Sequence, residues 1–217
     1  MHVDYKKLVN DFHQLYFSKM IQRELEGEIE SWLGYPILKC PLDLWVYQEI
    51  VFQSEPTLIV ETGTFKGGSA LYFSHLFDLM RREGRIISID IATQNNLPKH
   101  DRITYHTASS IDSSTIEFLK SRIRENDRIM VILDSDHHYD HVLKELQLYS
   151  PLVTNGLYLI VEDTNVSGNP VFDPRYDQGP MEAVLEFMKG DPPFTIDKKR
   201  EKHLLTYNPK GYLLRTE

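Results

Sequence analysis

The sequence predicts an α/β fold in which a mostly parallel β-sheet is flanked by helices. Short apolar runs alternate with longer segments of helical periodicity, as in residues 57–80. Several of these runs end in acidic residues, as expected for strands whose carboxyl ends open on one crevice. The 217 residues can bury a substantial core. We expect one domain over 1–217, with an N-terminal helical extension over 1–53 and the α/β core over 54–217.

Composition excludes several classes of protein. The formal net charge of −8 argues against a sequence-independent nucleic-acid binder, which needs a basic surface. Cys40 is the only cysteine, so neither an intrachain disulfide nor a multi-cysteine metal site can form. No apolar run is long enough to span a membrane, and the N-terminus lacks a signal-peptide core. We therefore expect a cytoplasmic protein.

The first 53 residues predict two helices. Residues 4 to about 31 have apolar side chains on or near one helical face, namely Leu8, Phe12, Leu15, Tyr16, Met20 and Leu25. This helix could cover the domain, line the substrate entrance or pair with another subunit, so a homo-oligomer is one of the open alternatives. Gly34, Pro36 and Pro41 then interrupt the pattern, and residues 42–52 predict a second amphipathic helix.

A strand, a glycine-bearing turn and a helix follow in residues 57–80. The apolar run 58–60 predicts a buried strand, and residues 69–80 have helical periodicity. Such a turn places backbone N–H groups at a helix N-terminus, where a nucleotide-like ligand can approach without meeting a Cβ. Turns of this kind also occur in strand–helix units that bind no ligand.

The glycine spacing in this turn disfavours a dinucleotide. The fingerprint G-x-G-x-x-G would need a second glycine where Thr64 stands, but the glycines are Gly63, Gly67 and Gly68. What remains is Glu61, an acidic residue two positions before the first glycine. This arrangement resembles the first motif of class I S-adenosylmethionine methyltransferases, and the resemblance implies a ligand without phosphate.

The second predicted strand, residues 84–91, is apolar until Asp90. An acidic residue at this position can accept hydrogen bonds from both ribose hydroxyls of a nucleoside. The alternative is a strand-end aspartate that caps a loop. A third strand over 103–105 leads to a loop of small and hydroxyl residues that includes Ser109. This loop could contact the ligand or could form the N-cap of a helix over 110–123, and the two roles are compatible.

Acidic residues follow two further apolar runs. Residues 129–133 predict a strand that delivers Asp134, and residues 157–161 predict one that ends in Glu162 and Asp163. Because neighbouring parallel strands end at the same sheet edge, we expect the three carboxylates to converge. Hard oxygen ligands of this kind suit Mg²⁺ better than zinc. Carboxylates at strand ends are also often solvated or cap the next helix.

The C-terminal third predicts a long loop, a helix and closing strands. The loop 164–180 is rich in Gly, Pro, Asn and Asp, and its position suggests a substrate role through residues 175–177 or a packed surface segment. A helix begins at Pro180 and ends at Gly190. Strands over 194–197, 203–207 and 212–215 would supply a C-terminal antiparallel pair, with a hairpin turn at 208–211.

Five sequence words also identify a resemblance to a known family. WLGYPILKCPLDLWVYQEI, ETGTFKGGSA, LDSDH, VEDTN and GPMEAV occur in order over almost the whole chain. Together they resemble the cephalosporin hydroxylase and rhamnosyl O-methyltransferase family. The resemblance implies a Rossmann-like class I methyltransferase fold that binds S-adenosylmethionine and, in characterised relatives, a divalent cation. It does not imply hydroxylation.

The resemblance assigns roles to the residues already singled out. It implies cofactor contacts from Glu61, Thr62, Gly63, Gly67, Gly68, Asp90, Ser109 and Asp134. It implies Mg²⁺ ligands at Asp134, Glu162 and Asp163, and in related sugar methyltransferases a histidine lies near these ligands. His137 is the first candidate for the base, since a neutral imidazole is available at pH 7. His138 is the second candidate, His141 fits the next helix, and a purely structural His137 stays an alternative.

We therefore predict an S-adenosylmethionine-dependent, Mg²⁺-assisted O-methyltransferase that acts on a hydroxyl of a sugar or sugar-containing metabolite. One alternative is a non-catalytic cofactor-binding partner in a cephalosporin-type modification complex. Another is a nicotinamide-dependent oxidoreductase, which the glycine spacing disfavours.

Overall fold

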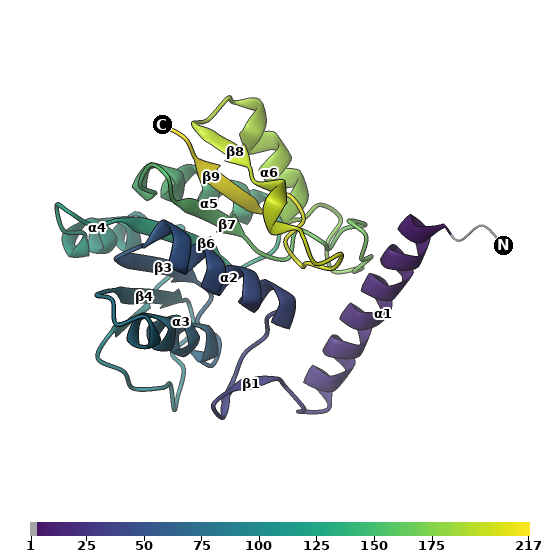
Figure 1. The fold of residues 1–217 in the computed structure, drawn as a ribbon, viewed down its shortest axis with the longest axis horizontal. Coiled ribbons are helices and arrows are strands. Elements are labelled where there is room, and N and C mark those ends of the chain that lie inside the picture. Colours follow the sequence, from purple (N-terminus) through teal and green to yellow (C-terminus); the bar gives the residue numbers. More distant parts are fainter. Residues whose placement is uncertain (1–3) are drawn as a thin grey trace.

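A computed structural model describes residues 4–217, so residues 1–3 of the expected extension lie outside the described part (Figure 1). The elements are α1 (Tyr5–Leu25), β1 (Ser31–Trp32), β2 (Tyr35–Pro36), α2 (Pro41–Ser54), β3 (Leu58–Thr62), α3 (Gly68–Leu79), β4 (Arg85–Asp90), β5 (Ile103–Thr107), α4 (Ser113–Arg122), β6 (Ile129–Leu133), α5 (Tyr139–Tyr149), η1 (Ser150–Leu152), β7 (Tyr158–Val161), α6 (Pro180–Lys189), β8 (Phe194–Ile196), η2 (Lys198–Arg200) and β9 (Tyr212–Arg215). None of the helices in this part of the chain is long and apolar enough to cross a bilayer.

Seven strands of the described chain form one sheet in the order β5-β4-β3-β6-β7-β9-β8. The first five in this order are parallel, whereas β9 runs antiparallel to both β7 and β8. The predicted fold class and the C-terminal antiparallel pair are therefore confirmed. The chain order reverses between β3 and β6, and ligands of such sheets bind outside the carboxyl ends of the strands at this point.

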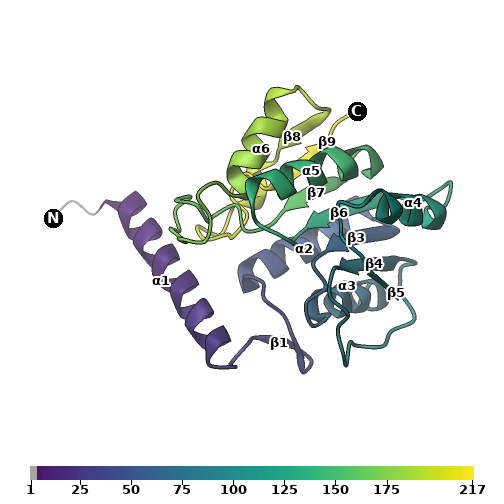
Figure 2. The same ribbon diagram turned by 180° about the vertical axis from the view of Figure 1, so that it is seen from behind.

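Helices cover both faces of the sheet. On one face, α2 and α3 bury Tyr47, Ile50, Phe73 and Phe77 against the strands. On the other face, α4, α5 and α6 pack on the sheet through a second apolar cluster (Figure 2). Both faces of β3 and β6 are consequently buried, which explains why these strands are continuous apolar runs rather than alternating ones.

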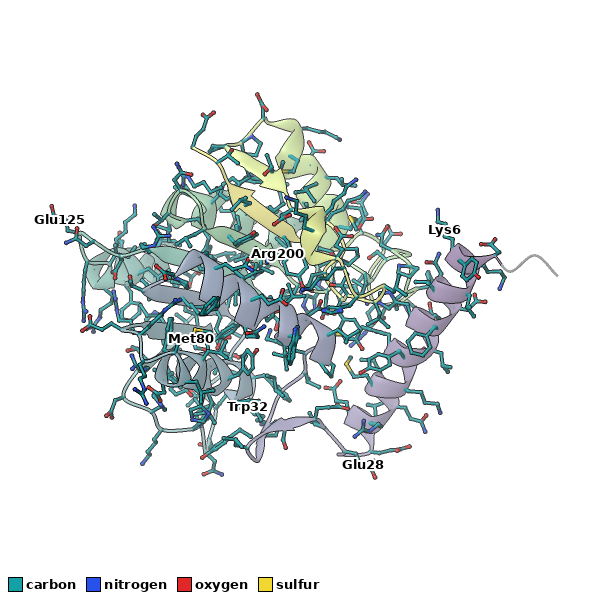
Figure 3. All side chains as sticks on the ribbon, viewed as in Figure 1. Lys6, Glu28, Trp32, Met80, Glu125 and Arg200 are labelled. Carbon is teal, nitrogen blue, oxygen red and sulfur yellow. The ribbon has the colours of Figure 1, made fainter. Side chains whose placement is uncertain are left out.

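The helix α1 stands beside the carboxyl edge of the sheet. Lys6, near the start of the helix, and Glu28, just beyond its end, lie on one side of the molecule, and Glu125, in the loop before β6, lies on the opposite side (Figure 3). The helix ends at Leu25, not near residue 31 as predicted, because Gly27 adopts a left-handed φ of +78° and closes it. Its bounds leave residues 26–30 in a turn.

The buried side of α1 also differs from the predicted face. Leu8, Phe12 and Leu15 are more than half exposed, whereas His13 and Phe17 are buried. The buried pair packs on Tyr207, which stacks on the imidazole with ring centroids 5.9 Å apart. Thus α1 docks on loops beside the carboxyl edge through a side that includes Tyr16 and Met20 of the predicted face. The other predicted residues of that face, Leu8, Phe12, Leu15 and Leu25, are exposed.

The prediction of a strand over 203–207 is wrong, because this stretch of the described chain is irregular. The buried carboxylate of Asp43 accepts hydrogen bonds from the Thr206 hydroxyl (2.6 Å) and the Tyr207 N–H (2.8 Å). It also accepts one from the Tyr212 hydroxyl (2.9 Å). These bonds tie the segment to α2 instead of to a neighbouring strand, so 208–211 leads into β9 without forming a hairpin.

Candidate active site

The glycine turn after β3 brings two backbone segments into direct contact. Gly63 has a φ of +87°, and a Cβ added there would lie 1.8 Å from the carbonyl oxygen of Asp134. Gly67 adopts a φ of +77° as the N-cap of α3. A Cβ on Gly68 would lie 2.3 Å from the carbonyl oxygen of Pro36. The turn therefore fits tightly between β6 and the segment before α2, and only glycine is tolerated there.

Replacing Gly63 by Ala is expected to destabilise the protein by about 3 kcal/mol, since it combines a left-handed backbone with overpacking. Gly156→Ala is the matched control, because Gly156 has a φ of +79° and no other described atom within 4 Å of an added Cβ. That variant should lose only about 1 kcal/mol. Urea denaturation measures both losses, and equal values would contradict the close contact.

Glu61 and Thr62 lie beneath this turn. The Glu61 carboxylate is 1% exposed and accepts hydrogen bonds from the hydroxyls of Ser69 and Ser88, both at 2.8 Å. Burial raises the pKa of Glu61 above its ordinary value. The Thr62 hydroxyl accepts a hydrogen bond from the Asp134 N–H at 3.2 Å. In this arrangement the two predicted cofactor residues fix the turn and the start of the acidic loop.

A cavity of about 280 Å³ lies outside the ends of β3, β4 and β6. Gly63, Asp90, Ser109, Ser110 and His141 are among the residues that line it. The Asp90 carboxylate accepts backbone hydrogen bonds from residues 65 (3.0 Å) and 92 (2.9 Å), which fix its direction. A carboxylate can accept further bonds, so hydroxyl groups of a ligand can also be held. The volume is close to the lower end for small-molecule sites.

A second, smaller cavity of about 30 Å³ continues from the first. It is lined by Gly63 and Ser69 on one side and by Ile37, Lys39 and Asp134 on the other. Gly63 borders both cavities. A ligand that occupies both would cross the glycine turn and end beside Asp134.

The acidic residues predicted at the ends of β6 and β7 do converge. The Lys39 ammonium donates to Asp134 Oδ2 (2.7 Å) and to Glu162 Oε1. The imidazole Nε2 of His137 lies 3.3 Å from Asp134 Oδ1 and 3.4 Å from Asp163 Oδ2. Asp134, His137 and Asp163 each have one potential ligand atom that lies within 4.8 Å of the other two. Such spacing would allow the three residues to hold one metal ion.

Burial and mutual charges set the protonation of this cluster. Burial acts to lower the pKa of His137, but the bond to Asp134 and the charge of Asp163 outweigh it and raise that pKa to about 9. Burial raises the pKa of Glu162 and of Asp163. The expectation of a neutral His137 at pH 7 is therefore wrong for the cation-free protein, because two carboxylates stabilise the imidazolium.

The other two histidines point elsewhere. The His138 side chain is 64% exposed and pairs with Asp136, outside the acidic cluster. His141 belongs to α5, as predicted, and its Nε2 lies 3.0 Å from the Ser110 hydroxyl and 3.1 Å from the Ser135 hydroxyl. It therefore faces the larger cavity. Of the three, only His137 contacts the carboxylates at both strand ends.

The long loop 164–179 and α1 border the cluster on the remaining sides. The Tyr176 ring lies edge-on to His137 at 5.9 Å between centroids. A cavity of about 70 Å³ separates α1 from the core and is lined by Tyr16, Arg23, Lys39 and Tyr207, among others. The Tyr207 hydroxyl is buried without a hydrogen-bond partner among residues 4–217. A ligand hydroxyl or a water molecule there would satisfy it.

Lys39 is the residue of the site that sequence reasoning missed. It lies in the irregular segment between β2 and α2, and its side chain is 3% exposed. A signal was available, because a lysine between Leu38 and Cys40 in a proline-bounded apolar segment needs an acidic partner if it is buried.

A surface hollow of about 1160 Å³ lies at the opposite edge of the sheet. Two ion pairs, Arg85 with Asp127 and Arg102 with Asp78, form part of its lining. It lies away from the carboxyl ends of the strands, where ligands of such sheets bind, and is therefore no candidate for the active site.

Comparisons with known proteins identify the family of the chain. The family model described as "Rhamnosyl O-methyltransferase/CmcI" matches residues 27–216. Rhamnosyl O-methyltransferase of Mycobacterium leprae (strain TN) is 32% identical over 213 residues, covering 96% of this chain and 90% of that protein. The protein of the same name from Mycobacterium tuberculosis (strain ATCC 25618 / H37Rv) is 32% identical over 214 residues, covering 96% and 85%.

Solved structures show the same fold. The apo structure of CmcI has a TM-score of 0.68 at 24% identity, covering 87% of this chain and 76% of CmcI. CmcI with Mg and SAM gives 0.67 at 22% identity, covering 87% and 77%. A putative caffeoyl-CoA O-methyltransferase from Staphylococcus aureus gives 0.55 at 15% identity, covering 88% and 91%.

Proposed function

The chain belongs to the rhamnosyl O-methyltransferase/CmcI family, and we infer that it is an S-adenosylmethionine-dependent O-methyltransferase. We propose further that its acceptor is a hydroxyl of a sugar or sugar-containing metabolite and that Mg²⁺ assists the transfer. The relatives named rhamnosyl O-methyltransferase make a rhamnoside the first acceptor to test.

One observation carries this proposal: a nucleoside-sized cavity and the acidic cluster meet at the same glycine turn. Gly63 borders the larger cavity, and its turn packs against Asp134 of the cluster. A methyl donor bound across the turn would therefore present its sulfonium end close to the carboxylates. Holding the two reactants in this way is the main task of a methyltransferase site.

The cofactor roles follow from the two cavities. We assign the ribose hydroxyls to Asp90 and the base to the side that Ser109 and Ser110 line. We place the methionine end on the side of the smaller cavity, between Ser69 and Lys39, which must widen from about 30 Å³ to admit it. Glu61 and Thr62 act through the turn, because their polar side-chain atoms are buried and already paired.

The donor set fits a hard divalent cation. We assign the cation to Asp134, Glu162 and Asp163, whose carboxylate oxygens lie at two adjacent strand ends and are the ligand type that Mg²⁺ selects. Asp134 and Asp163 already have oxygens close together beside His137, whereas Glu162 Oε1 faces Lys39. A bound Mg²⁺ supplies positive charge that lowers the pKa of an acceptor hydroxyl. His137 borders these carboxylates and is the group placed to take the hydroxyl proton.

Calorimetry with S-adenosylhomocysteine and NADH, followed by a transfer assay with labelled S-adenosylmethionine and a rhamnoside, tests the proposal. We expect saturable binding of S-adenosylhomocysteine only, and Mg²⁺-dependent labelling of the acceptor. Binding of NADH without binding of S-adenosylhomocysteine would overturn the cofactor assignment. Cofactor binding without transfer to any sugar would overturn the acceptor class.

Changing Asp90 to Asn should weaken S-adenosylhomocysteine binding about tenfold, because hydrogen bonds to a charged acceptor contribute about 1.5 kcal/mol or more. The amide oxygen of asparagine can keep only one of the two backbone bonds, because the N–H groups of residues 65 and 92 donate to different oxygens of Asp90. A melting curve of the variant therefore accompanies the binding measurement. Calorimetry measures the loss. Asp101→Asn, at an exposed position in the opposite hollow, is the control and should bind like the wild type.

A further inference from the structure

Lys39 is the most deeply buried ammonium group at the proposed active site. Its side chain is 3% exposed, and its Nζ donates to both Asp134 and Glu162. Two carboxylates from neighbouring strand ends therefore hold this ammonium group inside the site.

The ammonium divides the oxygens of the acidic cluster into two sets. Asp134 Oδ2 and Glu162 Oε1 face Lys39, whereas Asp134 Oδ1 and Asp163 Oδ2 face His137. A divalent cation on the first two oxygens would lie within a few ångströms of the ammonium, and each oxygen would have to divide its lone pairs between two repelling cations. The chain itself therefore carries a cation where two of the proposed metal ligands point.

We propose that Lys39 is a tethered competitor of the divalent cation: it holds Asp134 and Glu162 together in the cation-free protein and weakens divalent binding. This inference rests on the proposed function and concerns how the site is filled. Lys39 is a positioning residue, because it acts through the two carboxylates that it contacts. It also lines both the cavity beside α1 and the small cavity beside the glycine turn. A weakly held cation can enter and leave with each reaction cycle.

Two physical effects predict that Lys39 lowers the affinity for a divalent cation. Moving the ammonium aside to admit a metal ion breaks its two ion pairs, which costs free energy. Its positive charge also repels any cation that binds a few ångströms away, and this repulsion is strong in a buried site. Both effects predict that a neutral residue at position 39 binds divalent cations at least tenfold more tightly.

The test measures Mn²⁺ binding by calorimetry on the full chain without cofactor or acceptor. Lys39→Met should bind Mn²⁺ at least tenfold more tightly than the wild type, and its melting temperature should fall without metal and recover when Mn²⁺ is added. Lys39→Gln keeps two N–H donors for the carboxylates and serves if the Met variant does not fold. Lys39→Arg keeps the charge and should bind Mn²⁺ within about threefold of the wild type.

Lys144→Met is the matched control, because it removes the same charge from an exposed position on α5. It should leave Mn²⁺ affinity within about twofold of the wild type. Unchanged or weaker Mn²⁺ binding in both neutral variants of Lys39 would overturn the competitor role. If the wild type still showed saturable Mn²⁺ binding, the proposed function would stand without the competitor role. If neither the wild type nor any variant bound Mn²⁺, the proposed role of a divalent cation in the reaction would be overturned as well.

Discussion

Asp134→Asn is expected to lower the rate of Mg²⁺-dependent methyl transfer by about 10³-fold or more. The carboxylate of Asp134 contacts Lys39 through one oxygen and His137 through the other, so it joins the two halves of the acidic cluster. The amide keeps the size but loses the charge that would hold a cation. A loss of about 4 kcal/mol in transition-state stabilisation corresponds to this factor. Transfer of a labelled methyl group to a rhamnoside measures it.

A nearby carboxylate outside the cavities provides the control for this prediction. Asp140 is exposed, lies in the first turn of α5 and lines neither of the two proposed cofactor cavities. Asp140→Asn should therefore keep the rate within about threefold of the wild type. If Asp134→Asn stayed as active as Asp140→Asn, or if the wild type kept full activity in EDTA, the cation would have no part in the reaction.

The strand-end residues were predictable because the parallel topology determines where they lie. Once the apolar runs at 129–133 and 157–161 are recognised as neighbouring strands, Asp134 and the pair Glu162–Asp163 must end at one edge. Asp90 follows from the same reasoning, since β4 ends beside β3. Local pattern and topology agree at these positions, and the structure confirms their placement.

Residues on irregular segments could not be placed in this way. Lys39 reaches the cluster because Cys40 packs with Phe17 and Tyr207, two residues that are far away in sequence. Residues 203–207 are predicted as a strand, but the position of this segment is set by the buried Asp43 of α2. The periodicity of a sequence carries no information on such long-range contacts. The residues at the strand ends can therefore be predicted, whereas the residues on irregular segments that pack over them cannot.

The face of α1 illustrates a second limit. Its apolar residues recur at helical spacing, but the helix docks through a narrow side that includes the polar His13. The Asn165 side chain lies 3.1 Å from the His13 ring and supplies a polar partner there. Helical periodicity predicts which side chains share a face of the helix, but not which face packs against the rest of the domain.

His137→Gln is expected to lower the turnover number by about 10²- to 10⁴-fold, the usual contribution of a general base. The affinity for S-adenosylhomocysteine should stay within about threefold, since His137 is not among the residues that line the two proposed cofactor cavities. Rate measurements at saturating cofactor and calorimetry separate the two effects. His138→Gln is the control, because the side chain of that neighbour is 64% exposed and pairs only with Asp136 among the charged groups of the described chain.

The pH dependence supplies a second test of the same residue. A base must be unprotonated, and in the cation-free protein the pKa of His137 is raised to about 9 by Asp134 and Asp163. The unprotonated fraction therefore rises as pH increases through 9. A divalent cation on those carboxylates would offset the charge that stabilises the imidazolium, so the pKa of His137 should fall and the rising limb of the rate should shift to lower pH with increasing Mg²⁺. If the rising limb of the pH–rate profile did not move with Mg²⁺, or if it persisted in His137→Gln, a group other than His137 would be the base that takes the hydroxyl proton.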